Sequence, residues 1–592
     1  MEQLKMDFLY NGEPGWISSV RSNDWRIFAQ PLTTKLNTYI WSSGAWVNSS
    51  EASLEPGSKG RMKFTLAEDL NQSGDMLMLF LPFNPLARTK SDELFELPEN
   101  AESRWSWPVL EVRLPVSEII VKDFPVPTQP ETVFFDGWLR KAGEKFYALP
   151  EMPFNVNDIP AESLQIKLSS NFSSNKLRGS VTAEQPAEAR FMADRNFNEK
   201  VILEYAGKTH ELAMKNGNAV FELPLETEKN CELKAYCPNI ITEVSNYCDP
   251  GFYADLGYNV VWGDMHVHSR ESDGMGEPEE VMHRARDWQK LDFMAFNEHI
   301  EHSLAWRVWS KAKWAKLRKL YEESTVNGEF VIIPGFEYCS YCNLWCFNDE
   351  YHTYLAPEYN REGEYRLRRA DTEEGKLQAV EIQQKIAEFA SKPGWMVGYH
   401  RLEVLKTQLG KLPTPVHCLQ MAHYKRPPEV GSMDYLLRGD KVAFFGGTDT
   451  HLGMPAVGYT GSRTANSGLT ALLVRELDRK NLHEALLARR SYASLGSRTL
   501  CDMRLNGHIM GSQVQIAEGD AMEIVFRAAG KEKLKRLEIV IDGENAFVQD
   551  LDKTFCDCTF KTVKTTSKPG FVFARLHLED GRMVWTSPVY VN

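Results

Sequence analysis

Between residues 260 and 451, six short apolar runs each end in a histidine, a glutamate or an aspartate. The run ends read HVH, NEH, GFEY, YHTY, GYH and GTDTH, and amphipathic segments such as EPEEVMHRARDWQKL and LQAVEIQQKIAEFAS lie among them. Apolar runs that alternate with helical patterns predict parallel strands joined by helical crossovers. So many units in one stretch indicate a closed barrel, in which polar side chains at the strand ends meet at one face.

The run VVWGDMHVH shows how such an end can form a site. Alternate side chains of a strand point to the same face, so His266 and His268 can reach one point in space. For an isolated H-x-H pair, two solvated histidines would be the better interpretation. Because the other runs end in the same residue types, we predict a metal site, and imidazole with carboxylate ligands suits Zn²⁺, Mn²⁺ or Fe²⁺.

These motifs resemble the PHP (polymerase and histidinol phosphatase) superfamily of metallohydrolases. The family's opening motif, D-x-H-x-H followed by S-D-G, matches DMHVH and SDG here, and its closing D-x-H matches DTH. The second motif departs from the family's Thr-Asp-His, because Asn297 and Glu298 precede the histidine. The resemblance covers about residues 260–500 and implies a distorted (β/α)7 barrel that binds two or three divalent metal ions (Mn, Zn or Fe).

The resemblance also implies which residues hold the metals. The family's ligand positions are filled by His266, His268, Asp273, His299, Glu337, His352, His400, Asp449 and His451. The first metal would take His266, His268, Asp449 and Glu337. Glu337 would bridge to a second metal with His352 and His400, and a third would take Asp273, His299 and His451. Two cations lower the pKa of a shared water, so a metal-bridging hydroxide is the expected nucleophile, with Glu337 and Asp449 acting directly in catalysis.

Five other side chains are expected near these ligands. Arg270 and Arg401 lie beside ligand motifs and could clamp an anionic substrate, although a salt bridge at the rim explains them equally well. His423 could donate to the substrate or be structural. Asp264 is expected to orient a ligand histidine, whereas Tyr399 should point away from the metals and pack.

The regions on either side of the barrel consist of short apolar runs separated by turn residues, which is typical of β-sandwiches. We therefore predict a multidomain chain with an N-terminal β-rich domain (1–160), a small β-sandwich (161–255), the PHP-like barrel (256–500) and a C-terminal β-sandwich (501–592).

Composition excludes some functions. The 592 residues carry a net charge of −13 with no basic run, so neither nucleic acid nor an anionic membrane is an expected partner. No segment approaches the ~20 apolar residues of a spanning helix, and the N-terminus lacks a signal-peptide pattern, so a cytoplasmic location is expected. The string Cys339, Cys342 and Cys346 is better explained by buried thiols than by a metal site. The oligomeric state is not indicated.

Three functions remain in competition. The first is a phosphoesterase acting on a small molecule, which is the commonest chemistry of the resembled family. The second is hydrolysis of an ester, amide or carbamate, because the chain is distantly similar to carbaryl-type carbamate hydrolases and is rich in aromatic residues near the site. Those residues are Trp306, Trp309, Tyr338, Tyr341, Trp345 and Phe347. The third is a non-catalytic module that binds a glycan or a protein.

Overall fold

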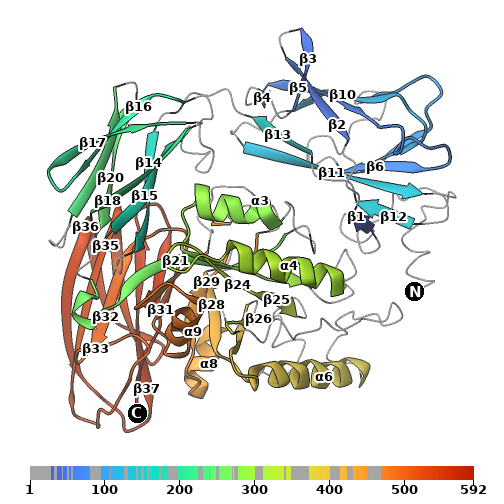
Figure 1. Cartoon of the computed structure of the whole chain (residues 1–592). Coiled ribbons are helices and arrows are strands. Elements are labelled where there is room, and N and C mark those ends of the chain that lie inside the picture. The colour runs from blue at the N-terminus through green and yellow to red at the C-terminus, as the bar shows by residue number, and fades with distance from the viewer. Residues whose placement is uncertain are drawn as a thin grey trace.

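The computed structural model describes residues 29–592 with interruptions. The longer ones are 81–94, 126–130, 185–196, 225–230, 272–277, 300–310, 349–372, 401–413, 423–430 and 457–467, and shorter ones include 270, 339–341 and 451–454. Within the described part, strands far outnumber helices, and the chain is a multidomain, mostly β protein (Figure 1). None of the described helices is both long enough and apolar enough to cross a membrane.

Two sheets make up the N-terminal part. The eight-stranded sheet contains β1 (Ala29–Pro31), β4 (Ser53–Leu54), β6 (Met76–Phe80), β8 (Ser103–Ser106), β9 (Val109–Arg113), β11 (Glu131–Lys141), β12 (Lys145–Ala148) and β13 (Met152–Val156). The five-stranded sheet contains β2 (Asn37–Ser42), β3 (Ala45–Asn48), β5 (Lys59–Thr65), β7 (Phe95–Glu96) and β10 (Glu118–Pro125). Side chains from both, including Ile40, Phe64 and Leu110, share one apolar core.

The next seven strands form one sheet with its own core, which includes Leu177, Val201 and Leu233. They are β14 (Ser163–Asn171), β15 (Lys176–Glu184), β16 (Lys200–Tyr205), β17 (Lys208–Ala213), β18 (Asn218–Pro224), β19 (Cys231–Cys237) and β20 (Ile240–Cys248). This sheet does not stand apart, because β14 contacts the first central strand and β20 contacts a C-terminal strand.

The central part combines short buried strands with the described helices. Its strands are β21 (Asn259–Val267), β22 (Phe293–Phe296), β23 (Glu298–His299), β24 (Val331–Ile333), β25 (Gly335–Tyr338), β26 (Cys342–Cys346), β27 (Trp395–Tyr399), β28 (Cys418–Ala422), β29 (Ala443–Gly446), β30 (Leu469–Val474) and β31 (Ser491–Ser494). Its helices are η5 (Ala254–Leu256), α3 (Pro278–His283) with the π-helical turn η6 (Arg284–Trp288), α4 (Lys311–Ser324), α6 (Glu373–Ala390), α8 (Ser432–Arg438) and α9 (Arg479–Leu487).

The central strands lie in two sheets that meet along both sides. One sheet contains β24, β22, β21, β30 and β31, and the other runs β23-β25-β26-β27-β28-β29. On one side the chain passes directly from β22 to β23 through Asn297 and from β24 to β25 through Pro334. On the other side the end of β21 meets the residues after β29, through a parallel bridge between Val267 and Thr450. The strands therefore close into a ring.

This ring does not support the predicted distorted (β/α)7 barrel. β25 pairs antiparallel with β26, and β26 pairs antiparallel with β27. Only residues 339–341 separate β25 from β26, and a crossover between parallel strands needs about a dozen residues or more. The run CNLWC must therefore turn back as a hairpin strand, which the sequence analysis did not predict. The predicted strand YHTYLAP lies outside the described residues.

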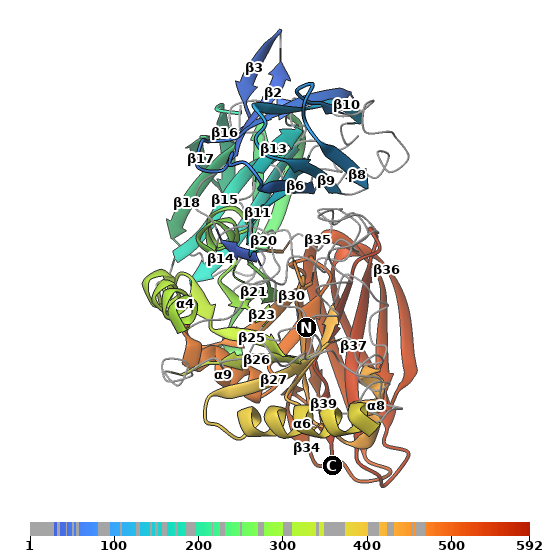
Figure 2. The ribbon, with the colours of Figure 1, turned by 90° about the vertical axis from the view of Figure 1, so that its right-hand side faces the viewer.

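The C-terminal strands continue the sheet of the central part. They are β32 (Leu500–Leu505), β33 (His508–Ile509), β34 (Gln513–Val514), β35 (Ala521–Ile541), β36 (Glu544–Val563), β37 (Gly570–Leu578), β38 (Met583–Thr586) and β39 (Val589–Val591). β31 pairs with β38, so hydrogen bonds between strands cross the expected boundary at residue 500. Figure 2 shows the long strands β35, β36 and β37 standing beside the ring, and one apolar cluster spans both parts.

Candidate metal centre

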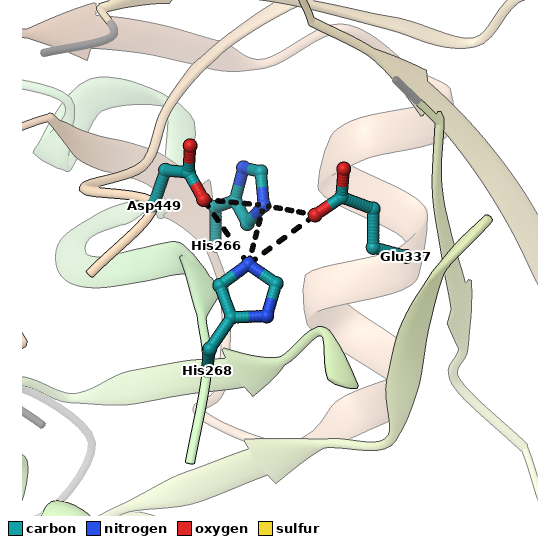
Figure 3. Close-up of side chains that lie close together, drawn as sticks. All are labelled: His266, His268, Glu337 and Asp449. Carbon is teal, nitrogen blue, oxygen red and sulfur yellow. Dashed lines mark hydrogen bonds and ion pairs between the residues drawn. The ribbon is translucent and has the colours of Figure 1, made fainter. Parts of the chain in front are cut away.

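The site begins at the end of β21. Every residue from Val260 to Val267 in this strand is buried, as expected for a strand covered on both faces. Alternation along the strand brings the side chains of His266 and His268 to the same side, and both are fully buried. Their Nε2 atoms lie 3.1 Å apart (Figure 3), so the two imidazoles converge on one point.

Two carboxylates from distant parts of the chain complete this group. Glu337 in β25 places Oε2 3.1 Å from Nε2 of His266 and 3.2 Å from Nε2 of His268. Asp449, in the turn after β29, places Oδ1 at 3.3 and 3.1 Å from the same two nitrogens. The four ligand atoms all lie within 4.8 Å of one another, and all four residues are buried (Figure 3).

The spacing of these atoms fits a metal ion. A tetrahedral ion with bonds of roughly 2.0–2.1 Å to nitrogen and oxygen separates its ligand atoms by about 3.3 Å. The five separations that involve an imidazole nitrogen, between 3.1 and 3.3 Å, fall close to that value, and the two carboxylate oxygens lie within 4.8 Å of each other. Two imidazoles with two carboxylates also form a donor set that suits zinc, manganese or iron. The group can therefore hold a divalent metal.

Two further histidines contact the same glutamate. Nε2 of His299, at the end of β23, lies 3.4 Å from Oε2 of Glu337. Nε2 of His400, directly after β27, lies 3.1 Å from the other oxygen, Oε1. Burial raises the pKa of Glu337, but the imidazoles around it outweigh this and hold the pKa well below its usual value. The carboxylate is therefore charged, with imidazoles at both oxygens.

Asp264 organises the loop that carries Asp449. Its Oδ1 accepts hydrogen bonds from the backbone N–H groups of His266 and Thr448 at 3.1 and 3.0 Å. Its Oδ2 accepts from the Thr448 hydroxyl at 2.6 Å and from the backbone of Ala456 at 3.0 Å. Burial raises the pKa of Asp264, and these hydrogen bonds oppose that rise. In the structure Asp264 thus contacts the backbone of a ligand histidine and the loop, rather than the imidazole ring that it was expected to orient.

Gly447, directly after β29, lies against the end of β21. A Cβ atom on Gly447 would lie only 2.5 Å from Cβ of His266, so only glycine allows this approach. Asp449 itself has a φ of +52°, a conformation that aspartate tolerates better than most residues. Its backbone N–H donates to the carbonyl of His266 at 2.8 Å, and the Thr450 carbonyl accepts from His268 at 3.1 Å. The turn is thereby fixed to the strand that carries both histidines.

Sequence reasoning missed two polar residues next to this group, whereas Glu298 was already named beside His299. Gln420 in β28 and Asn343 in β26 both lie beside His266 Nδ1, at 3.2 and 3.3 Å. The carboxylate of Glu298 accepts hydrogen bonds from the backbone and hydroxyl of Ser269, directly after His268. The available signal was a single polar residue inside each buried apolar run, CLQMA and CNLWC.

The remaining predicted residues divide into two groups. Those outside the described residues are Arg270, Asp273, Trp306, Trp309, Cys339, Tyr341, His352, Arg401, His423 and His451. Of the others, Tyr399 is fully buried and its hydroxyl donates to the Pro415 carbonyl at 3.0 Å, as expected for packing. Trp345 is also fully buried, against Phe445. Cys342 and Cys346 are buried thiols, and Sγ of Cys346 donates to the Asn348 carbonyl at 3.4 Å.

Comparisons with other sequences give distant relatives. No family model matches the chain. An uncharacterised protein of Chlamydia pneumoniae is 22% identical over 373 residues, which cover 57% of this chain and 58% of that protein. Uncharacterised proteins of Chlamydia muridarum and Chlamydia trachomatis are 28% identical over 140 and 141 residues, 21% of this chain and 22% of theirs. The chain thus spans little more than half the length of the first relative and about a fifth of the other two.

Solved structures resemble the chain only weakly. A two-domain protein of Bacteroides vulgatus, described as containing a predicted PHP-like metal-dependent phosphoesterase, shares 14% identity. The alignment covers 56% of this chain and 96% of that one, with a TM-score of 0.29. A β-glucuronidase of Bacteroides uniformis shares 9% identity over 95% of this chain and 80% of its own, with a TM-score of 0.19. Neither TM-score is high enough to transfer an activity.

Proposed function

We propose that this protein is a metal-dependent hydrolase that cleaves phosphoesters of a small-molecule substrate. The observation that carries the proposal is the arrangement around Glu337. Its Oε2 lies within the group formed with His266 and His268, whereas its Oε1 lies 3.1 Å from His400. A buried carboxylate with imidazoles at both oxygens is suited to bridge two cations, and a pair of cations is a common device for hydrolysis.

The described residues divide naturally between these cations. His266, His268, Asp449 and Oε2 of Glu337 would hold the first. Oε1 of Glu337 and His400 would hold the second, together with His352 from the family resemblance. A third ion would take His299 with Asp273 and His451, again by resemblance. Manganese, zinc and iron are the proposed metals because all the ligands are imidazoles and carboxylates.

When bound, such ions supply an activated water near neutral pH and neutralise the oxygens of a phosphoester. The chain's own task is to hold the ligands rigidly and to limit access of bulk water. His266, His268 and Glu337 are at most 2% exposed, and Asp449 is 6% exposed. Arg270, Arg401 and His423 are proposed to bind the substrate, the arginines as anion clamps. No serine or cysteine nucleophile is required.

The buried aromatic residues favour a phosphoester over a neutral ester or carbamate. The second function rested on a distant similarity to carbamate hydrolases and on six aromatic residues around the site, of which the structure describes three. Those three, Tyr338, Trp345 and Phe347, are only 3%, 0% and 4% exposed. They belong to the apolar clusters of the ring, which supports a packing role for them.

Metal content and substrate preference test the proposal together. We would purify the protein without chelators and measure bound metals by elemental mass spectrometry. Hydrolysis of p-nitrophenyl phosphate, p-nitrophenyl acetate and an aryl carbamate would then be compared after loading with manganese, zinc or iron. We expect at least two equivalents of metal and turnover of the phosphoester alone.

The variant His266→Ala should lose both metal and turnover, while His210→Ala, in β17 of the seven-stranded sheet, should keep both. Ester or carbamate turnover without phosphoester turnover would reject the substrate class but not the metal centre. Less than half an equivalent of metal after loading would reject the whole proposal.

A further inference from the structure

His266 can bind a cation through Nε2 only if its proton is on Nδ1. In a neutral imidazole one nitrogen donates and the other accepts, and the partner of each nitrogen selects the tautomer. Nε2 of His266 faces the carboxylates of Glu337 and Asp449. Without a partner for Nδ1, these carboxylates would draw the proton to Nε2, and a protonated Nε2 cannot bind a cation.

Hydrogen bonds donated by its nitrogen fix the orientation of the Gln420 amide. Its Nε2 atom donates to two backbone carbonyls, at 2.7 Å from Gly447 O and 3.1 Å from Ala422 O. An amide that donates to two carbonyls must present its oxygen on the other side. That oxygen lies 3.2 Å from Nδ1 of His266, where it can accept only from a protonated nitrogen.

Two further side-chain amides, Asn297 and Asn343, connect to Nδ1 of His266. The Asn297 side chain satisfies its surroundings with its nitrogen toward the carbonyls of Met265 and Ala295 and its oxygen toward Trp345 Nε1, all at 3.0 Å. That oxygen also lies 3.1 Å from the Asn343 amide. The Asn343 atom placed 3.3 Å from Nδ1 of His266 is the amide nitrogen. Since the Asn297 oxygen can only accept, we infer that the Asn343 amide is turned over, so that its nitrogen donates to Asn297 and its oxygen takes the position beside Nδ1.

We propose that Gln420 and Asn343 are positioning residues that keep the proton of His266 on Nδ1 and so reserve Nε2 for the metal. The expected effect on metal binding rests on the proposed function, whereas the position of the proton on His266 does not. Gln420, Asn343 and Asn297 are 7%, 0% and 0% exposed, so water does not replace them readily. Both acceptors are neutral amides, which add no negative charge beside Glu337 and Asp449.

Gln420 also donates to the Gly447 carbonyl, two residues before Asp449. It therefore contacts both the His266 imidazole and the turn that carries Asp449.

The tautomer can be read directly in metal-free protein. We would label the histidines with ¹⁵N and record long-range ¹H–¹⁵N correlation spectra, identifying the His266 signal by its loss in His266→Ala. The wild-type protein should show His266 protonated on Nδ1. Protonation on Nε2 in the wild type would overturn the inference without any variant.

Variants then test which residues hold the proton. Gln420→Met and Asn343→Leu remove the acceptors at similar side-chain volume, and each should weaken zinc binding about 10–100-fold in chelator competition. Asn343→Asp keeps an acceptor and should recover most of the affinity that Asn343→Leu loses. Gln549→Met, on the long strand β36, is the control and should bind zinc as the wild type does.

The outcomes separate the two proposals. Unchanged zinc affinity in both folded variants, with His266 still protonated on Nδ1, would overturn the role of the amides. A His266 proton that moves from Nδ1 to Nε2 in Gln420→Met or Asn343→Leu would support the role of the amides. This holds even if these variants fold less stably, because the wild-type and Asn343→Asp spectra provide the comparison. A wild-type protein that binds no metal would reject the proposed function, while the tautomer result would stand by itself.

Discussion

Nε2 of His400 lies 3.1 Å from Oε1 of Glu337, the carboxylate oxygen that faces away from His266 and His268. β25 carries Glu337 and His400 directly follows β27, and β26 pairs antiparallel with both strands. The hairpin that interrupts the expected βα order therefore sets the spacing between Glu337 and its second imidazole.

Replacing Glu337 by glutamine tests its bridging role. An amide has an acceptor on one side only, so it cannot serve two cations. We expect Glu337→Gln to lose at least one metal equivalent. Phosphoester turnover should fall more than about 100-fold, since loss of a residue that only orients a ligand already costs about 10–100-fold. Elemental mass spectrometry and steady-state kinetics measure both, with the exposed Glu388→Gln as control. Full metal content in Glu337→Gln would contradict the bridge.

Metal removal should destabilise the wild-type protein. A ligand that binds only the folded state stabilises it by about 2.7 kcal/mol at a concentration of 100 times its Kd. Treatment with EDTA should therefore lower the thermal midpoint, and added zinc or manganese should restore it. The variant His268→Ala should show the same midpoint with and without chelator. A wild-type midpoint that does not respond to metal in differential scanning calorimetry would count against a tightly held ion.

Gly447→Ala tests the close approach of β21 and the turn that carries Asp449. The added methyl group would lie 2.5 Å from Cβ of His266. Overpacking of this kind costs about 1–3 kcal/mol, and here it should also weaken zinc binding, because the two ligands are pushed apart. Gly519→Ala is a control for backbone strain without overpacking, since its φ is +88° and its added methyl would meet nothing within 4 Å. Urea unfolding and zinc titration of both variants would show whether only Gly447→Ala loses affinity.

Arg498 connects the seven-stranded sheet to the central part. Its guanidinium donates to the carbonyl of Leu168 at 2.7 Å and to that of Lys290 at 3.0 Å, and it also donates to Gln289. We expect Arg498→Ala to lower the free energy of unfolding by about 2–3 kcal/mol, because hydrogen bonds to a charged group are among the stronger ones. Arg498→Lys should recover little, since an ammonium lacks the planar fork. Equal urea midpoints for all three proteins would refute this.

Glu532 should make stability depend on pH. Burial raises its pKa, but Arg582 and Lys531 outweigh that effect and the pKa lies below its ordinary value of 4.5. A carboxylate with a lowered pKa stabilises the fold above the unfolded value, and this contribution disappears as the pH falls through the folded pKa. Between pH 7 and pH 3, wild-type protein should therefore lose more stability below about pH 4.5 than Glu532→Gln does. Urea unfolding at several pH values measures the difference, and parallel curves would contradict it.

The sequence by itself determined which side chains could gather. Period-two alternation places His266 and His268 on one side of a strand, whatever that strand pairs with. Polar residues at the ends of buried apolar runs, such as Glu337 and His400, cannot remain in an apolar core without partners. These constraints act over a few residues, so they can be recognised from the sequence alone.

The tertiary structure decided how those strands pair. The hairpin of β25 and β26 replaces a parallel crossover, and β31 joins β38 across residues that lie about ninety positions apart. Gln420 and Asn343 reach His266 over 154 and 77 positions, and no local pattern encodes such contacts. Each depends on the register and direction of several strands at once, because a hydrogen-bonding partner is fixed only when the backbone of both strands is in place.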